Sequence, residues 1–303
     1  MNIRQFNLWN RISAAAVFVV SAVTYLLTIE PTASFWDCGE FIASSYKLEV
    51  GHPPGNPVFQ LIARFFTMFT DNMHAAVAVN AMSALCSALT ILFLYLTVVF
   101  FAKRLVKASE DGAYTLPRAI AIYGSGIVGA LAYCFSDTFW FSAVEGEVYA
   151  MSSLFTALVF WAMTRWYEQA DTPYANRWIV LISFLMGLSI GVHLLNLLAI
   201  PALVFIYYFR TTEKVTFKGM VYATLIAGAI LLFINNIIIP YTVWIGAQID
   251  TLFVNTFGLP VNSGITLFAL ALIIGLGWAA WAAHKRGRVL LNIILLSTTM
   301  ILV

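Results

Sequence analysis

The stretch "AAVAVNAMSALCSALTILFLYLTVVFFA", residues 75–102, contains no charged side chain. A helix needs about 20 apolar residues to cross the hydrocarbon core of a bilayer, so this run predicts a transmembrane helix. Only 10% of the 303 residues are Asp, Glu, Lys or Arg, against about 25% in ordinary soluble domains. The mean hydropathy is +0.88. The sequence therefore predicts an integral membrane protein.

Similar apolar runs recur on both sides of this stretch. We expect further transmembrane segments at 12–29, 119–135, 148–164, 219–241, 265–283 and from 289 onward. The segment 178–209 is too long for one span and too short for two, and polar residues interrupt it midway. We interpret it as two short helices that meet at a polar break. The predicted fold class is all-α: a polytopic transmembrane helical bundle over residues 1–303, with about nine spans or half-spans.

Both ends of the chain need an interpretation. Arg4 and Arg11 precede the run 12–29, which suits either a secretory signal peptide or a first span. Because the run is long and leads directly into a charged loop, we interpret it as a retained span. At the other end, "LLSTTMILV" stops inside an apolar run. We therefore expect the natural chain to continue beyond residue 303.

The distribution of charge predicts the orientation. If the N-terminus is cytoplasmic, fourteen of the sixteen Lys and Arg residues fall on the cytoplasmic side, and only Lys47 and Arg64 lie outside. This bias is the one that the positive-inside rule expects. Nine of the fourteen acidic residues then fall on the outer side. Any chemistry that uses carboxylates is expected there. The basic residues are spread over short loops, so binding to nucleic acid is not expected.

The first outer loop, "ASFWDCGEFIASSYKLEVGHPPGNP" at residues 33–57, holds an unusual share of the few charges. Ser34 is placed to cap a helix, with Asp37 three residues later in a capping-box arrangement. The segment "GHPPGNP" then forces a turn, because each proline restricts itself and its predecessor. Asn56 is placed to cap a second helix that has Pro57 at its first position. Two short surface helices around a rigid turn are expected.

Asp37 and Glu40 are the candidate catalytic residues of this loop. A carboxylate held near the headgroups beside a second carboxylate has the raised proton affinity that a general base needs. The alternative is that Asp37 only completes the helix cap and Glu40 faces water.

The motif "DCGEFIASSYKLEVGHPPGNPVFQLIARFF", residues 37–66, resembles the signature of a membrane protein family long described as a domain of unknown function. That signature has an Asp-Ser-Gly-Glu segment, then His-Pro-Pro-Gly followed by Tyr-Pro. The family includes the animal plexin-type protein O-mannosyltransferase and many proteins of Bacteroidetes-type bacteria. Two positions depart from it: Cys38 stands where Ser is usual, and Asn56 stands where Tyr is usual.

The resemblance implies a glycosyltransferase of the GT-C type. Such an enzyme moves a sugar, here mannose, from a polyprenyl-phosphate carrier to Ser or Thr hydroxyls of secreted or membrane proteins. Carried over, Asp37 becomes the base that takes the proton of the acceptor hydroxyl, and the lipid phosphate leaves with inversion. Glu40 orients the acceptor or tunes Asp37. An alcohol is a poor nucleophile until a base accepts its proton, so the residues suit this chemistry.

Further residues are candidates for binding the substrates. The family carries a Glu and an aromatic residue at the positions of Glu147 and Tyr149, and a polar break at His193 and Asn196, so these four are expected to line the donor or acceptor site. The departing phosphate needs a cationic or hydrogen-bonding partner on the outer side, for which His52 is the first choice and Arg64 the second.

Each of these candidates has a simpler alternative. Glu147 can belong to an acidic solvated loop, and His52 can be only a turn residue held by backbone contacts. His193 and Asn196 can form helix-to-helix hydrogen bonds inside the membrane.

No metal site, cofactor or disulfide is expected. The four histidines have no helical pairing, and neither H-E-x-x-H nor C-x-x-C occurs. Cys38 lies in the outer loop, whereas Cys86 and Cys134 fall within spans, so they form no disulfide framework.

Two other functions remain open. One is a GT-C enzyme that acts on a lipid or glycan acceptor. The other is a solute transporter, which more often shows inverted repeats and charges buried mid-span. The predicted location is a multi-pass protein of the inner membrane in a bacterium, or of the endoplasmic reticulum in a eukaryote, with the active site facing the extracytoplasmic side.

Overall fold

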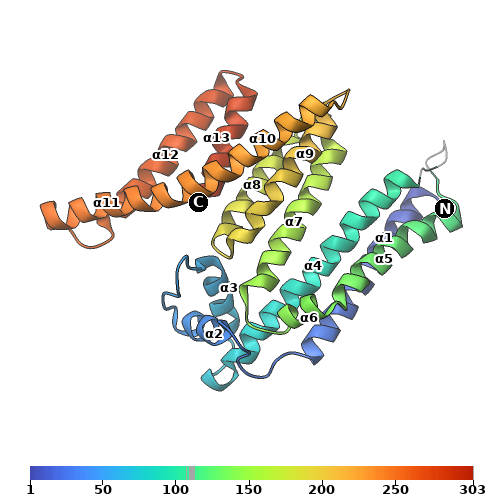
Figure 1. The fold of residues 1–303 in the computed structure, drawn as a ribbon, viewed down its shortest axis with the longest axis horizontal. Coiled ribbons are helices and arrows are strands. Elements are labelled where there is room, and N and C mark those ends of the chain that lie inside the picture. The colour runs from blue at the N-terminus through green and yellow to red at the C-terminus, as the bar shows by residue number, and fades with distance from the viewer. Residues whose placement is uncertain (107, 109–112, 303) are drawn as a thin grey trace. The chain divides into compact units, whose positions relative to one another are not determined.

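The computed structural model describes residues 1–106, 108 and 113–302, and these residues form helices and no strand (Figure 1). They fall into two compact units. The first comprises Met1–Thr164 with Leu188–Asn196, and the second comprises Arg165–Gly187 with Leu197–Val303. All of the candidate site residues lie in the first unit. The all-α, polytopic fold class is confirmed.

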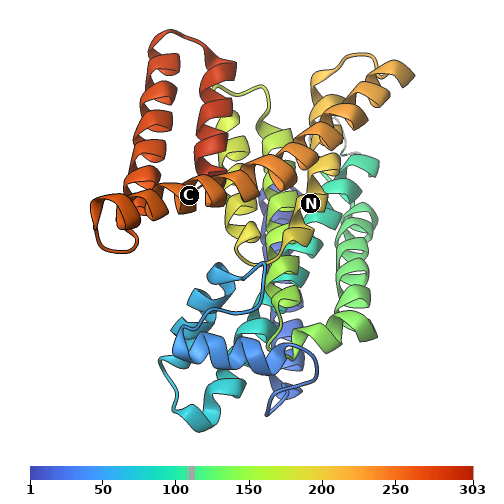
Figure 2. The ribbon, with the colours of Figure 1, turned by 60° about the vertical axis from the view of Figure 1, so that its left-hand side comes forward.

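Three long helices form the core of the first unit: α1 (Ile3–Leu27), α4 (Ala75–Leu105) and α5 (Leu116–Cys134). They lie side by side in both views (Figures 1 and 2). Buried tyrosines join them, since the hydroxyl of Tyr25 donates to the backbone oxygen of Cys134 at 2.8 Å. Such bonds between helices satisfy polar groups that lipid cannot hydrate.

The segment between α1 and α4, which includes the first outer loop expected from the sequence and is called the outer loop from here on, forms a cap beside one end of α4 (Figure 1). It contains α2 (Cys38–Lys47), α3 (Pro57–Thr67) and the short helix η1 (Asn72–His74). The two short helices around a turn are therefore confirmed. After α5, the helix α6 (Asp137–Ala143) and the long α7 (Val148–Gln169) are bent by 110° relative to each other. The four residues between them carry Glu145 and Glu147.

The rest of the chain is also helical. Its elements are α8 (Asn176–Ile190), η2 (Leu194–Ala199), α9 (Ile200–Thr211), α10 (Phe217–Phe233), η3 (Ile234–Ile238), α11 (Ile239–Phe257), α12 (Ser263–Lys285) and α13 (Val289–Leu302). In the second unit, α12 and α13 lie side by side (Figure 2). Gly187 of α8 packs so closely on α13 that a Cβ atom there would lie 2.5 Å from the backbone oxygen of Met300. Small residues allow this close approach between two apolar helices.

Most of the expected spans are confirmed, and two are corrected. The segment expected to span from residue 289 onward is, in the described residues, the shorter apolar helix α13 (Val289–Leu302), which is not among the helices long enough to cross a membrane. Within the described residues, six helices are long and apolar enough to cross a membrane, or seven if α6 and α7 make one bent span. The segment 178–209 does form two short helices that meet at a break. The span expected at 219–241 is wrong at its end, because helix continues from Phe217 to Phe257. A wider π-helical turn at Ile234–Ile238 precedes Pro240 and accommodates the ring that would clash in a regular helix.

Candidate active site at the outer loop

The start of α2 differs from the sequence-based expectation. Trp36 has a φ of +61°, which a right-handed helix cannot include, so α2 begins only at Cys38. Ser34 does not cap it. Its hydroxyl instead interacts with Glu145 and favours the charged form of that carboxyl. Asp37 occupies the N-cap position, but among the described residues its side chain makes no capping hydrogen bond. The alternative that Asp37 merely completes a cap is therefore wrong. Its carboxylate is 58% exposed and available.

The second cap also forms differently. Asn56 stands at the N-cap of α3 with Pro57 at the first position, as expected, but the Asn56 side chain does not cap. The backbone oxygen of Gly191 accepts instead from the N–H of Val58 at 2.8 Å. A Cβ atom on Gly191 would lie 2.5 Å from a methyl group of Val58. The polar break after α8 thus docks on the first turn of α3, which brings His193 to the outer loop.

An exposed cluster forms around the turn between α2 and α3. The backbone N–H of His52 donates to Oε1 of Glu40 at 2.6 Å, and Nδ1 of His52 lies 3.1 Å from Oε2 of Glu40. These bonds hold the pKa of Glu40 below its ordinary value. The other ring nitrogen, Nε2, lies 4.0 Å from Oδ2 of Asp37. Glu40 therefore orients the His52 ring with its free nitrogen toward Asp37.

A buried cluster lies behind α2. Sγ of Cys38 is 3.7 Å from Oε2 of Glu145 and 3.8 Å from Oε1 of Glu147. Both glutamates are 5% exposed. The N–H of Val148 donates to Oε2 of Glu147 at 3.2 Å. Burial raises the pKa of Glu147 to about 7, and it also raises the pKa of Glu145 and of the Cys38 thiol. The alternative of a solvated acidic loop is therefore wrong for Glu147.

The two clusters meet at a cavity of 350 Å³, here called the outer cavity. Its lining includes five of the eight residues expected at the site and one further residue: Asp37, His52, Asn56, Glu147, Tyr149 and His193. The ring centroids of Tyr149 and His193 are 5.5 Å apart. Nδ1 of His193 accepts from the N–H of Leu195 at 3.1 Å.

Among the described residues that line the outer cavity, three of the expected site residues are missing: Glu40, Arg64 and Asn196. Glu40 touches it only through His52. Arg64 donates to the backbone oxygen of Tyr46 at 2.5 Å and so ties α3 to the end of α2. Oδ1 of Asn196 accepts from the Thr156 hydroxyl at 2.7 Å. This hydrogen bond joins two segments of the chain, as the alternative interpretation of Asn196 expected.

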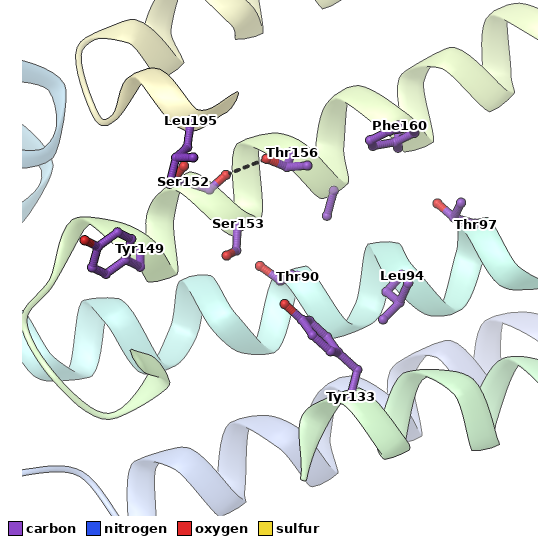
Figure 3. A pocket seen from close by; sticks show the side chains of 11 residues that line it. Thr90, Leu94, Thr97, Tyr133, Tyr149, Ser152, Ser153, Thr156, Phe160 and Leu195 are labelled. Atoms are coloured by element: carbon purple, nitrogen blue, oxygen red, sulfur yellow. Dashed lines mark hydrogen bonds between the residues drawn. The ribbon is translucent and has the colours of Figure 1, made fainter. Parts of the chain in front are cut away.

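A second cavity of 330 Å³, here called the membrane cavity, lies between α4, α5 and α7. Tyr149 lines both cavities. Figure 3 shows the hydroxyl groups of Thr90, Tyr133 and Ser153 pointing toward one another inside it. The hydroxyl of Thr90 already donates to the backbone oxygen of Cys86 in its own helix at 2.9 Å. Leu94 and Phe160 add apolar walls.

Sequence reasoning missed two features of this site. Asn56 is 5% exposed, and its amide oxygen and nitrogen have no hydrogen-bond partner among the described residues. The only signal was its departure from the resembling motif. The second feature is the contact of Cys38 with both buried glutamates, which joins residues more than a hundred positions apart.

Asp37, Glu40 and His52 also offer ligand atoms within 4.8 Å of one another. A metal ion can bridge such a spacing, but all three side chains are exposed and Glu40 already binds His52. The absence of a metal stays a prediction. The three cysteines are free, as expected.

Comparison with known proteins identifies the family. A family model described as the N-terminal domain of protein O-mannosyl-transferase TMEM260 matches residues 37–216, more than half of the chain. The chain belongs to this family. The matched segment of the TMEM260 N-terminal domain begins at Asp37 and contains every expected site residue. The resemblance of the outer-loop motif to an O-mannosyltransferase family is confirmed.

Two curated relatives carry the same family name. The chain is 24% identical over 237 residues to protein O-mannosyl-transferase tmem260 of Dictyostelium discoideum, which covers 72% of this chain and 27% of the relative. It is 28% identical over 178 residues to protein O-mannosyl-transferase TMEM260 of Mus musculus, which covers 58% of this chain and 23% of the relative. The chain thus spans about a quarter of their length. No solved structure matches the chain.

Proposed function

We propose that this chain carries the membrane-embedded catalytic site of a protein O-mannosyltransferase. The enzyme moves mannose from a polyprenyl-phosphate carrier to Ser or Thr hydroxyls of secreted or membrane proteins, on the extracytoplasmic side, by the GT-C route. Both curated relatives bear the name protein O-mannosyl-transferase. The observation that carries the proposal is the carboxylate of Asp37, which is exposed at the outer cavity and makes no capping hydrogen bond to α2.

In this proposal Asp37 is the general base. The acceptor hydroxyl gives its proton to Oδ2 of Asp37 while its oxygen attacks the anomeric carbon of the sugar. The bond from that carbon to the phosphate oxygen breaks on the opposite face, so the configuration inverts and the prenyl phosphate leaves with the electron pair. A base must reach the acceptor proton at hydrogen-bond distance. The exposure of Asp37 at the cavity supports that access.

His52 and Glu40 form the phosphate side of the proposed site. Glu40 binds both the backbone N–H and Nδ1 of His52, so Nε2 is turned toward the cavity that Asp37 lines. When protonated, that nitrogen donates a charge-assisted hydrogen bond, the kind that binds phosphate strongly. Glu40 is thus a positioning residue for His52, and the role of Arg64 is to hold α3 against α2.

The membrane cavity supports a lipid-linked donor. It adjoins the outer cavity at Tyr149, and neighbouring residues, Leu194 and Leu195, line one cavity each. Its threonines Thr90 and Thr97 donate their hydroxyls to their own helix, so these two polar groups are satisfied without a partner from the ligand. We propose that the first isoprene units lie there while the sugar phosphate occupies the outer cavity.

The test is mannosyl transfer from prenyl-phosphate mannose to a Ser/Thr peptide, measured with the full-length protein that contains this chain. Asp37→Asn keeps the shape of the side chain but removes the base, and we expect it to lower the rate by about 100-fold or more. Glu49→Gln is the matched control, because Glu49 is exposed, pairs with Lys47 and does not line the outer cavity.

Each outcome decides something. Loss of transfer in Asp37→Asn with normal transfer in Glu49→Gln supports the base. Equal rates in both variants remove Asp37 from the chemistry. Absence of transfer from the wild type, with either a peptide or a glycan acceptor, contradicts the proposed function itself.

A further inference from the structure

Glu147 is a buried acid on the outer cavity, in which the proposed function places the donor phosphate. Its side chain lines the outer cavity, yet it is 5% exposed. Val148 donates to its Oε2, and Oε1 lies beside the Cys38 thiol. No described residue forms an ion pair with it. A buried carboxylate without a cation is costly, so the group keeps its proton instead.

The charges around Glu147 are mostly negative. Asp37 faces it from the start of α2, and Glu145, itself influenced by Glu30, lies two residues away. Only His52, from the turn, and His193, from the break after α8, can add positive charge to the cavity lining. Among the lining residues that the structure describes there is no Lys or Arg.

A sugar phosphodiester that enters this cavity brings one more negative charge. With Asp37 and Glu147 both ionised, it would meet two carboxylates and at most two imidazolium groups. With Glu147 protonated, the repulsion from that residue disappears and its O–H becomes a hydrogen-bond donor. The amide of Asn56, buried and unpartnered on the same cavity, offers a further donor.

We propose that Glu147 binds the donor phosphate as a neutral acid, donating its O–H to a phosphate oxygen, so that donor binding is coupled to proton uptake at this residue. This inference rests on the proposed function of the outer cavity. Where Glu147 is ionised before the donor binds, one proton enters from solvent on binding and leaves again after the prenyl phosphate departs; where Glu147 already holds its proton, the donor binds without proton uptake. Glu147 forms no covalent bond and is a positioning residue for the donor. Asp37 remains free to take the proton of the acceptor.

The geometry and the acidity of Glu147 agree. Burial, and after it the charges of Glu145 and Asp37, raise the pKa of Glu147 to about 7. Below that pH the carboxyl is neutral and ready to donate. Donor affinity is therefore expected to fall as the pH rises, by about tenfold between pH 6 and pH 8 for one linked proton.

The experiment measures binding of prenyl-phosphate mannose to the full-length wild type, and its KM and kcat, at about pH 6 and about pH 8. A phosphodiester is used because it keeps one charge over this range. Glu147→Gln keeps a neutral hydrogen-bond donor that cannot lose its proton, so its donor affinity should fall less between the two pH values than that of the wild type; the dependence that remains belongs to the imidazole of His52, which lines the same cavity. Its affinity should match that of the wild type at low pH. The effect should appear in KM and not in kcat.

Glu145→Gln is the matched control, because Glu145 is equally buried but does not line the outer cavity. It should keep the pH dependence, with the midpoint moved to lower pH, since the charge of Glu145 helps to hold the proton on Glu147. Donor binding by the wild type that does not change with pH overturns the inference, as does a pH dependence that is as large in Glu147→Gln as in the wild type. Failure of the donor to bind at any pH contradicts the proposed function instead.

Discussion

Two clusters of carboxyl groups lie on either side of the first turn of α2, and they behave in opposite ways. In the exposed cluster, Glu40 receives two hydrogen bonds from His52, and its pKa is lowered. In the buried cluster, Glu147 lies beside the Cys38 thiol and its pKa is raised to about 7. Asp37 and Cys38 are neighbours in sequence, yet one belongs to each cluster. Environment, and not residue type, assigns these acids to different tasks.

The contrast corrects the argument made from the sequence. We expected a desolvated carboxylate pair, Asp37 with Glu40, to have raised proton affinity. Glu40 instead has a lowered pKa, and the desolvated pair is Glu145 with Glu147. Asp37 is available to a substrate because its carboxylate is exposed and does not cap α2.

The largest expected effect concerns the buried cluster and pH. The folded protein holds the proton of Glu147 up to about pH 7, whereas the ordinary value is 4.5. Between these values the folded state binds more protons than the unfolded state, so stability falls as the pH rises. The expected loss is on the order of 3 kcal/mol. Thermal unfolding in detergent across this range measures it. Glu147→Gln should flatten the curve, and an unchanged slope would contradict the raised pKa.

A smaller effect is expected from the glycine between the two buried glutamates. A Cβ atom on Gly146 would lie 2.9 Å from Oδ1 of Asn80 and 3.2 Å from Ile42 of α2. Gly146→Ala should therefore lower the free energy of unfolding by about 2 kcal/mol. Gly124→Ala is the control, because nothing lies within 4 Å of the added carbon. If both variants unfold at the same temperature, that result contradicts the close packing of this loop on α2 and α4.

The exposed cluster is broken by Glu40→Gln. This change removes the charge that binds His52, while α2 keeps its backbone bonds. We expect kcat for mannosyl transfer to fall about tenfold, as for the loss of a charge-assisted hydrogen bond, with no change in the thermal midpoint. Glu49→Gln again serves as control. A loss of stability equal to the loss of rate would give Glu40 a structural role instead.

The smallest effect is expected at Ser34. Its hydroxyl interacts with Glu145 and does not cap α2, so Ser34→Ala should cost less than about 1 kcal/mol. Hydrogen exchange in the first turn of α2 should not change. Faster exchange there would instead support the capping box between Ser34 and Asp37 that the sequence indicated.

Part of this protein is determined by its sequence alone. Uncharged runs such as 75–102 fix the membrane helices, because a span has to satisfy its backbone internally and expose apolar side chains. The prolines of "GHPPGNP" fix the turn, since they restrict the backbone locally. The motif from Asp37 to Phe66 indicates the family. Each of these signals acts within a short stretch of the chain, and therefore each can be recognised from the sequence alone.

The site itself was decided by tertiary structure. The carbonyl of Gly191 replaces the side chain of Asn56 as the cap of α3, and Cys38 meets Glu145 across more than a hundred residues. No local pattern encodes these contacts. Burial and hydrogen bonding set the proton affinity of a carboxyl group, and both depend on which distant segments pack against it. The sequence supplied the acids, and the packing of α2, α3, α4 and the loop before α7 decided which of them are exposed and which hold a proton.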